Sequence, residues 1–314
     1  MGIVAILGGP TASGKTALAL RWAKAKNLEI ISADSRQNYR GFCIGTGAPT
    51  EKETAHIPHH LTGFLDPQEN FSPKSFRTAV VEILATHPET NFLLVGGTGL
   101  YIKELLYGGT SRGETPPEIR TQAEKEISVK GLSAVYAELL AKDPEGMDRV
   151  DARDKHRIQM RLENQILTGR PFRDFAFSKT IDARFENVPV FWLDPTRETL
   201  HANIADRIRN MAAQGWLDEV RSLLERHDPS TAPAFNALGY RELAEVARGK
   251  ASLSGTWEDI AQRTRQYAKR QTTFFRHQIP GARSASPEAL ETALQQADWD
   301  VQRLVQKGFG EVCD

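Results

Sequence analysis

A short segment near the N-terminus has the residue types and the spacing of a phosphate-binding loop. Its sequence, Gly9-Pro-Thr-Ala-Ser-Gly14-Lys15-Thr16, places a lysine and a threonine directly after the second of two glycines. In such loops, backbone N–H groups and a helix N-terminus cradle phosphate oxygens, the lysine reaches the terminal phosphate, and the final hydroxyl suits Mg²⁺. We expect the phosphate ligand to be held by Gly9, Pro10, Thr11, Ala12, Ser13, Gly14, Lys15 and Thr16, with Thr16 as the metal ligand.

Asp34 is the second candidate for chemistry, because it follows the apolar run Leu28–Ser32 after a single alanine. A carboxylate in this position could act as a general base, bind Mg²⁺ or form a turn, and the residues alone leave the three roles open. The phosphate loop is equally open, since a kinase, a nucleotide hydrolase and a transferase that releases diphosphate would share it. The chain contains no Asn-Lys-x-Asp motif for base recognition, which argues against a GTPase switch.

The elements that must position these residues form a parallel β-sheet. Short apolar runs at Ile3–Leu7, Leu28–Ser32 and Phe92–Val95 are typical of buried parallel strands, and a helical pattern over Thr16–Lys26 follows the loop. Because ligands bind at the carboxyl ends of such strands, we expect the loop, Asp34 and the glycine-rich turn after Val95 to converge. The predicted fold class is α/β, with a P-loop NTPase-like parallel sheet core flanked by helices.

The middle of the chain predicts a separate helical insertion. Between Glu114 and Asn187 no strand-like run occurs, and a further strand follows at Val188–Leu193. Helices are expected over Ile119–Val129, Leu132–Leu140, His156–Leu167 and Thr256–Arg276, after Pro195 with an interruption at Gly215, and past Pro287. The expected domains are residues 1–113 with 188–314 as the core and its helical C-terminal region, and 114–187 as the insertion.

Composition restricts the partners. The 314 residues carry 40 Lys+Arg and 40 Asp+Glu, so any nucleic-acid surface must be local. The stretch Ile260–Pro287 lacks Asp and Glu and is the candidate surface; its basic residues are Arg263, Arg265, Lys269, Arg270, Arg276 and Arg283. Two cysteines exclude a disulfide framework or a four-cysteine zinc site, and no apolar run has the length of a membrane helix. We expect a cytoplasmic monomer without membrane association.

The order of the motifs resembles the bacterial tRNA dimethylallyltransferases, also called tRNA isopentenyltransferases. The shared motifs are the phosphate loop at 9–16, Asp-Ser-x-Gln-x-Tyr at 34–39, Ile-Gly-Thr at 44–46, Pro-His-His-Leu at 58–61, Val-Gly-Gly-Thr-Gly-Leu-Tyr at 95–101, Leu-Gly-Tyr at 238–240 and Tyr-Ala-Lys-Arg-Gln at 267–271. The resemblance spans nearly the whole chain. It implies transfer of a dimethylallyl group from dimethylallyl diphosphate to N6 of the adenine 3′ of the anticodon, in tRNAs that read codons starting with U.

The resemblance also implies roles for individual residues. Asp34 would be the general base, Thr98 would contact the adenine, and Arg207 would face the donor diphosphate. On spacing alone, Thr98 could equally be a helix N-cap and Arg207 a solvated helix position. The implied cofactor is Mg²⁺, and the implied partners are dimethylallyl diphosphate and the tRNA anticodon stem-loop. The implied tRNA contacts are Asp34, Ser35, Arg36, Gln37, Thr98, Arg120, His156, Arg157, Ile158, Gln159, Met160, Lys269, Arg270 and Gln271.

The chain departs from the family pattern at a few positions near the expected site. Cys43 and Ala48 stand where the family usually has Asp and Lys, Asn236 replaces an arginine, and Met160-Arg161 shifts another arginine by one position. These departures affect the detail of tRNA contacts and leave the phosphate loop and Asp34 unchanged.

Two other functions use the same features. A small-molecule kinase would need the loop and Asp34, yet it would not need the basic C-terminal helix or a long helical insertion. A non-catalytic RNA-binding ATPase would explain the basic stretches but would leave the Gly96–Thr98 turn without a role.

Overall fold

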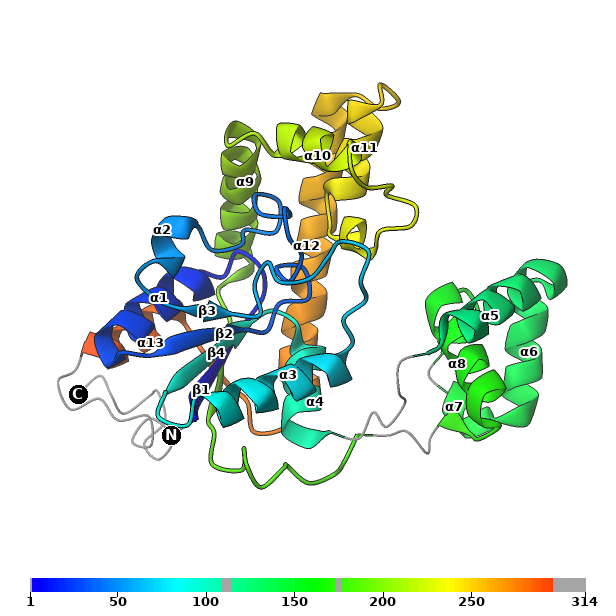
Figure 1. Ribbon diagram of the computed structural model, residues 1–314, viewed down its shortest axis with the longest axis horizontal. Helices are drawn as coiled ribbons and strands as arrows, with labels where there is room; N and C mark the ends of the chain where they lie inside the picture. Colours follow the sequence, from blue (N-terminus) through cyan, green and yellow to red (C-terminus); the bar gives the residue numbers. More distant parts are fainter. Residues whose placement is uncertain (1, 109–114, 149, 173–176, 296–314) are drawn as a thin grey trace. The chain divides into compact units, whose positions relative to one another are not determined.

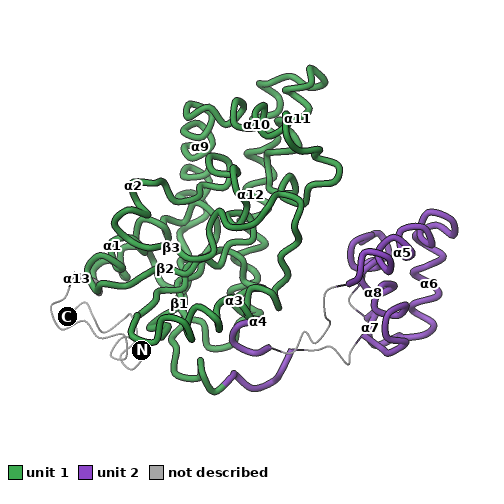
Figure 2. Tube along the Cα trace, viewed as in Figure 1, with its two compact units in different colours: residues 1–103, 183–314 green, residues 104–182 purple. Residues whose placement is uncertain are grey.

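The computed structural model describes residues 2–108, 115–148, 150–172 and 177–295 and forms two compact units. Unit 1 comprises Met1–Lys103 with Ala183–Asp314, and unit 2 comprises Glu104–Asp182 (Figure 2). This division falls earlier in the chain than the predicted boundaries at 113/114 and 187/188. The two connecting segments pair with each other: Ser178 donates its backbone N–H to the carbonyl of Gly108, and Asp182 donates to that of Leu106.

Within the described residues, unit 1 contains a parallel sheet of six strands in the order β3-β2-β4-β1-β5-β6 (Figure 1). The strands are β1 (Ile3–Gly8), β2 (Glu29–Ser32), β3 (His59–His60), β4 (Phe92–Gly96), β5 (Val190–Leu193) and β6 (Arg283–Ala285). Every residue of β4 and β5 is buried, which explains why these strands are continuous apolar runs. The four predicted strands and the predicted fold class are confirmed. The two edge strands, β3 and β6, are too short to give a hydrophobic pattern.

Helices cover the sheet and extend beyond it in unit 1. They are α1 (Lys15–Lys26), α2 (Glu51–Thr54), α3 (Pro73–Thr86), α4 (Gly99–Tyr107, which crosses into unit 2), α9 (Arg197–Ala213), α10 (Trp216–Leu224), α11 (Tyr240–Ala247), α12 (Leu253–Gln278) and α13 (Pro287–Gln295), with a 3₁₀ turn η2 at Pro233–Asn236. Helix α3 is additional to the predicted elements, although Ser72 caps it and Pro73 begins it. The predicted interruption is confirmed, because Gly215 has a φ of 91° between α9 and α10.

Two apolar cores hold unit 1 together. One lies between the sheet and α1, where Leu18, Trp22, Leu93 and Phe191 are buried. The other joins α9, α10, α11 and α12 through a separate set of large side chains, among them Phe42, Ile204, Trp216, Phe235 and Tyr240. Helix α12 thereby connects the sheet edge to this helical layer, and the site lies along it.

Unit 2 is helical, as predicted. Its elements are α5 (Pro117–Lys130), α6 (Leu132–Lys142), α7 (Pro144–Met147) and α8 (Lys155–Thr168). They enclose a core of their own, which includes Ala123, Val135, Ile158 and Leu162. None of the described helices in either unit is long and apolar enough to cross a membrane.

Candidate active site

The phosphate loop connects β1 to α1, as the sequence predicts. Gly9, Ala12 and Gly14 have φ angles of 142°, 61° and 86°, so the loop depends on left-handed backbone positions. Gly14 is the N-cap of α1, and no side chain in the described part of the chain caps the first turn of this helix. The first N–H groups of α1 are thus available to a ligand, and the helix dipole favours an anion there.

Side chains from two distant helices hold this loop in place. Asn203 of α9 donates its amide to the carbonyl of Ala12 at 3.0 Å. Gln271 of α12 accepts the N–H of Thr11 at 2.8 Å. A left-handed conformation at a non-glycine residue such as Ala12 costs about 1–2 kcal/mol, so these bonds stabilise a strained segment. Asn203 was not predicted as part of the site; the available signal was its position one helical turn before Arg207 on α9.

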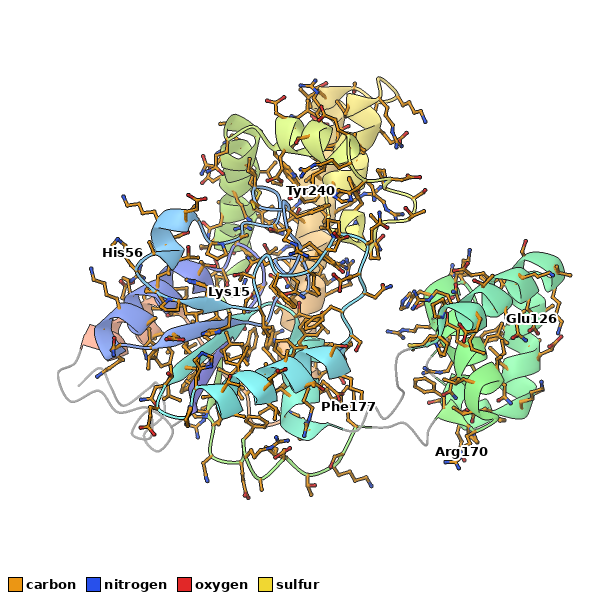
Figure 3. All side chains as sticks on the ribbon, viewed as in Figure 1. Lys15, His56, Glu126, Arg170, Phe177 and Tyr240 are labelled. Carbon is orange, nitrogen blue, oxygen red and sulfur yellow. The ribbon has the colours of Figure 1, made fainter. Side chains whose placement is uncertain are left out.

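Lys15 lies at the centre of unit 1 and donates to the carbonyl of Pro10 at 3.2 Å (Figure 3). Burial lowers its pKa to about 8; the Asp34 carboxylate opposes this shift, and the Arg207 guanidinium adds to it. Lys15, Asp34 and Arg207 line the same cavity, so the three charged groups predicted from separate segments lie in one site.

Asp34 and Thr98 lie on neighbouring turns at the carboxyl ends of β2 and β4. The Oδ1 atom of Asp34 accepts the N–H of Arg36 at 2.9 Å, which confirms a turn role beside any chemical one. Thr98 accepts the N–H of Ser35 at 3.0 Å through its hydroxyl. Its carbonyl accepts the N–H of Tyr101, so Thr98 also occupies the N-cap position of α4. The turns approach so closely that a Cβ at Gly96 would lie 2.1 Å from the carbonyl oxygen of Ala33.

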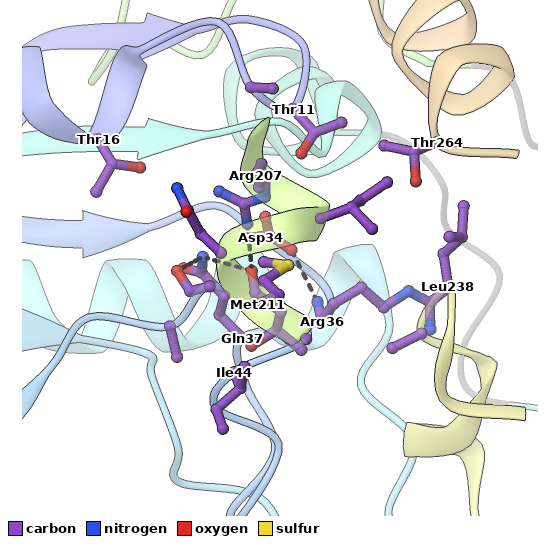
Figure 4. Close-up of a pocket in the computed structure, with 18 of the residues that line it drawn as sticks. Thr11, Thr16, Asp34, Arg36, Gln37, Ile44, Arg207, Met211, Leu238 and Thr264 are labelled. Carbon is purple, nitrogen blue, oxygen red and sulfur yellow. Dashed lines mark hydrogen bonds between the residues drawn. The ribbon is translucent and has the colours of Figure 1, made fainter. Parts of the chain in front are cut away.

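Arg207 is half-buried and does not lie on a solvated helix face. Its guanidinium donates to the carbonyl of Thr46 at 3.1 Å and points toward Asp34 (Figure 4). Burial lowers the pKa of Arg207, and Asp34 opposes this shift. The amide of Gln37 donates to the same Thr46 carbonyl at 3.3 Å and to that of Gly47 at 2.9 Å. The loop 43–48 is thus attached to the site by Arg207 and Gln37.

The far side of this loop is attached to Glu219, a residue that the sequence analysis missed. The Glu219 carboxylate accepts the N–H groups of Cys43 at 3.0 Å and Ile44 at 2.7 Å, and the hydroxyl of Tyr240 at 2.6 Å. Tyr240 lies among the helices of the second core (Figure 3). The family motif at 238–240 was a signal for this contact. The contact with Glu219 is made by backbone N–H groups of the loop 43–48. It is therefore kept although Cys43 stands where the family usually has Asp.

A cavity of about 1180 Å³ in unit 1 is lined by the phosphate loop, the segment after β2, the loop 43–48 and residues of α9 and α12 (Figure 4). Its polar lining residues include Lys15, Thr16, Asp34, Arg36, Gln37, Asn203, Arg207, Arg270 and Gln271. Its apolar lining residues include Ile44, Ile208, Met211, Trp216 and Leu238. The cavity thus offers an anion site and a carboxylate beside an apolar surface, which suits a ligand with a diphosphate and a hydrocarbon group.

Few of the described side chains are of a kind and in a place to bind a metal ion. Among the described residues no group of three or more His, Cys, Asp and Glu side chains could hold a metal ion. Thr16 is exposed and lines the cavity together with Asp34. Mg²⁺ is commonly bound through one or two protein oxygens plus the phosphates of a substrate, and these residues fit that mode.

The basic stretch Ile260–Pro287 is partly neutralised in the structure. Arg263 forms ion pairs with Glu242 and Asp259, each at 2.9 Å, and Arg276 pairs with Asp194 at 2.9 Å. Two of the six basic residues of the candidate surface are thus paired, with acidic residues that lie on α12 itself just before the stretch, on α11 and after β5. Lys269 and Arg270 are exposed and have no acidic partner within 4.0 Å among the described residues.

The remaining predicted tRNA contacts in unit 1 and unit 2 differ in accessibility. Gln271 is only 6% exposed, and both ends of its amide are hydrogen-bonded to backbone groups of the protein. Ile158 is 0% exposed in the core of unit 2, so its side chain cannot form a surface contact. The exposed predicted residues of unit 2 are Arg120, His156 and Arg157, whereas Gln159 and Met160 are half-buried.

Two departures from the family pattern can be placed. Arg161 donates to the carbonyl of Gly146 at 3.0 Å, and its guanidinium lies 3.3 Å from the ring centroid of Phe172. The shifted arginine therefore faces the interior of unit 2. Asn236 lines the cavity of unit 1, where the family usually has an arginine.

Comparison with known proteins identifies relatives of the whole chain. A family model described as IPP transferase matches residues 37–278. The tRNA dimethylallyltransferase of Geobacter metallireducens is 39% identical over 277 residues, covering 86% of this chain and 88% of that protein. That of Bacillus velezensis is 36% identical over 280 residues, covering 88% of each.

Solved structures agree with these relatives. The tRNA delta(2)-isopentenylpyrophosphate transferase of Staphylococcus epidermidis superposes with a TM-score of 0.65 at 29% identity, covering 94% of this chain and 96% of that one. A eukaryotic dimethylallyltransferase acting on tRNA superposes with a TM-score of 0.74 at 24% identity, covering 97% of this chain and 78% of that one, and at this identity it supports the fold alone.

Proposed function

Because the chain belongs to the IPP transferase family, we propose that its cavity brings dimethylallyl diphosphate and a tRNA adenine together for prenyl transfer. Transfer of a dimethylallyl group to tRNA is the activity of the family, and the chain is an enzyme of this class. The proposed acceptor is N6 of the adenine 3′ of the anticodon, in tRNAs that read codons starting with U. The observation that carries the proposal is the meeting of Lys15, Asp34 and Arg207 in one cavity.

The phosphate loop would stabilise the leaving group. When the allylic C–O bond breaks, negative charge develops on the diphosphate oxygens. The uncapped N–H groups of α1, the Lys15 ammonium and the Arg207 guanidinium are fixed donors directed at that charge. Mg²⁺ bound by Thr16 and the diphosphate would supply further charge neutralisation. The apolar lining at Ile44, Ile208 and Met211 suits the hydrocarbon part of the donor.

Asp34 would accept the proton of the acceptor amine. As the adenine N6 attacks the allylic carbon, a C–N bond forms, the C–O bond breaks, and one N6 proton becomes acidic. The Asp34 carboxylate would accept this proton as the C–N bond forms. Thr98, whose hydroxyl accepts the N–H of Ser35 next to Asp34, would contact the adenine. Positioning of the weak amine nucleophile is the other main contribution.

The tRNA would contact two exposed basic regions. Lys269 and Arg270 lie on α12 beside the cavity, and Arg120, His156 and Arg157 lie on the surface of unit 2. RNA loops are recognised mainly by splayed bases and backbone contacts, which such surfaces provide. A tRNA substrate is consistent with a cytoplasmic enzyme, and a monomer suffices for the proposed chemistry because unit 1 alone supplies every group named for it.

The two alternative functions, a small-molecule kinase and a non-catalytic RNA-binding ATPase, are not favoured. The family and its relatives transfer prenyl groups to tRNA, and neither the kinase nor the RNA-binding ATPase explains the apolar wall of the cavity. The test is incubation of the protein with unmodified tRNA, Mg²⁺ and radiolabelled dimethylallyl diphosphate. We expect label in the RNA and release of diphosphate. Unlabelled RNA, or transfer of phosphate from ATP to a small molecule under parallel conditions, would contradict the proposal.

A further inference from the structure

Gln271 is a buried polar residue in an otherwise apolar or threonine-containing face of α12. The buried positions of this helix are Thr256, Ile260, Thr264, Ala268, Gln271 and Phe275, which repeat every three or four residues. Burial of an amide is costly unless both its donor and its acceptor are hydrogen-bonded. The position of Gln271 therefore needs a reason beyond packing.

Both ends of the Gln271 amide are bonded to backbone at the active site. Its Oε1 accepts the N–H of Thr11, in the phosphate loop, at 2.8 Å. Its Nε2 donates to the carbonyl of Gly97, next to Thr98, at 2.8 Å. One side chain thus joins the loop proposed to hold the donor diphosphate to the turn proposed to hold the adenine. The glutamine amide carries both the acceptor and the donor that these two backbone groups need.

The glycine-rich turn is shaped around this helix. A Cβ at Gly97 would lie 2.3 Å from the Nε2 atom of Gln271. Similar close contacts occur three and four residues further along α12, since a Cβ at Gly99 would meet Phe274 at 2.4 Å, and a Cβ at Gly8, in β1, would meet Phe275 at 2.2 Å. Helix α12 can therefore approach the ends of β1 and β4 closely because glycines stand at the positions that face it.

We propose that Gln271 is a positioning residue that fixes the separation of the donor and acceptor sites. This inference rests on the proposed function of the two turns. Because Lys269 and Arg270 directly precede Gln271 on α12, the same residue connects the proposed tRNA surface to the reacting centre. A 1 Å misplacement of reacting groups can cost roughly 10²-fold in rate, so loss of this link should reduce transfer more than binding.

The test compares two substitutions with nearly the same shape. Gln271→Met removes both hydrogen bonds, and Gln271→Glu keeps an acceptor for Thr11 but places a carboxylate oxygen against the Gly97 carbonyl. We expect single-turnover transfer at saturating substrates to fall roughly 10²-fold in both at pH 8, with the Kd for tRNA within about threefold of wild type. Binding of inorganic diphosphate, measured by calorimetry, should weaken in both variants. In Gln271→Met the N–H of Thr11 loses its acceptor, and in Gln271→Glu the loop gains a charged neighbour.

The pH dependence separates positioning from a general loss of structure. A carboxyl group held in a buried site against a carbonyl has a raised pKa, and once protonated it can donate to Gly97 again. The ratio of the Gln271→Glu rate to the wild-type rate should therefore rise as pH falls from about 8 to about 6. The corresponding ratio for Gln271→Met should stay flat. The charged groups that line the cavity, Lys15, Asp34, Arg207 and Arg270, are the same in all three proteins, so their effect largely cancels in these ratios.

Gln262→Met, an exposed change on the same helix, is the matched control and should behave like wild type. Wild-type transfer rates in Gln271→Met would overturn the inference. So would a loss of tRNA affinity that fully accounts for the lower rate, or equal pH profiles of the two variants. If wild-type protein itself labels no tRNA, the proposed function fails, and the diphosphate titration still reports whether Gln271 shapes the loop.

Discussion

Lys15 shows how burial prepares a residue for an anionic ligand. It donates to Pro10 and lies near Arg207, and burial lowers its pKa to about 8. A bound diphosphate favours the protonated form and so offsets the cost of this burial. The charge of Lys15 is therefore coupled to the presence of its ligand.

We expect Lys15→Ala to reduce transfer roughly 10²- to 10³-fold, as loss of a charge-stabilising donor does elsewhere. In the wild type, affinity for diphosphate should fall about tenfold per pH unit above about pH 8, because Lys15 loses its proton there; the variant should lack this dependence. The effect of pH on folding has the opposite sign. Between about pH 8 and pH 10.5, the unfolded state binds more protons at Lys15 than the folded state does, so the contribution of Lys15 to the free energy of unfolding rises with pH. An unchanged pH profile of diphosphate binding in the variant would refute this assignment.

Asp34→Asn tests the proposed base most directly. Asparagine can still accept the N–H of Arg36, so the turn is preserved while proton acceptance is lost. We expect single-turnover transfer to fall about 10²- to 10⁴-fold, with tRNA and diphosphate affinities changed by less than about tenfold. Because Asp34 opposes the downward shift of the Lys15 pKa, the pH at which diphosphate binding weakens should also move lower.

The result of Asp34→Asn would separate the three roles that the sequence leaves open. A metal ligand would show a shifted Mg²⁺ requirement with weakened diphosphate binding. A residue needed only for the turn would leave transfer unchanged. Circular dichroism of the variant is the control for folding.

At the scale of elements, the site is assembled by helices that attach to loops. Helix α9 contributes Asn203 to the phosphate loop and Arg207 to the loop 43–48. Helix α10 holds the opposite side of the loop 43–48 through Glu219, and α12 contributes Gln271. Hydrogen bonds to a charged group contribute about 1.5–3 kcal/mol each, so the Glu219 contacts are a substantial constraint on the loop.

The exposed part of α12 is where we expect tRNA phosphates to bind. Lys269→Glu combined with Arg270→Glu should weaken tRNA binding and reduce the magnitude of its salt slope by about 2, because each lost phosphate contact removes close to one unit. Diphosphate affinity should change little. The matched control is Lys24→Glu with Lys74→Glu, two exposed lysines on α1 and α3. The same slope and affinity in both double variants would show that α12 presents only a solvated face.

For the molecule as a whole, the two units have separate apolar cores and therefore separate stabilities. Ile158 is 0% exposed in the core of unit 2. Ile158→Ala should lower the free energy of unfolding of this unit by about 2–5 kcal/mol, and Ile158→Val by only about 0.5–1.5 kcal/mol. Calorimetry should detect a shifted transition in the alanine variant.

The functional readout of Ile158→Ala follows from the same separation. We expect diphosphate binding by unit 1 to persist at temperatures at which unit 2 has unfolded, while tRNA affinity falls. Simultaneous loss of both activities at one temperature would show that the units unfold together.

Sequence determined the parts of this protein that depend on contiguous residues. The phosphate loop, the buried strands and the helices of unit 2 follow from local backbone geometry and hydrophobic periodicity, which are written in neighbouring positions. Asp34 and Thr98 were placed correctly at strand ends for the same reason, since parallel strands carry their carboxyl ends to one edge. The pairing of Leu106 with Asp182, which joins the two segments that lead into and out of unit 2, has no local signal in the sequence.

Only the tertiary structure decided which distant side chains meet. Gln271 reaches Thr11 across 260 positions of sequence, Asn203 reaches Ala12 across 191, and Glu219 reaches Ile44 across 175. The stretch 260–287 contains no acidic residue, yet Asp194 and Glu242 from other segments form ion pairs with its arginines. Such contacts depend on how helices pack on the sheet, and packing is the sum of many weak apolar contacts that leave no spacing pattern between the two residues concerned.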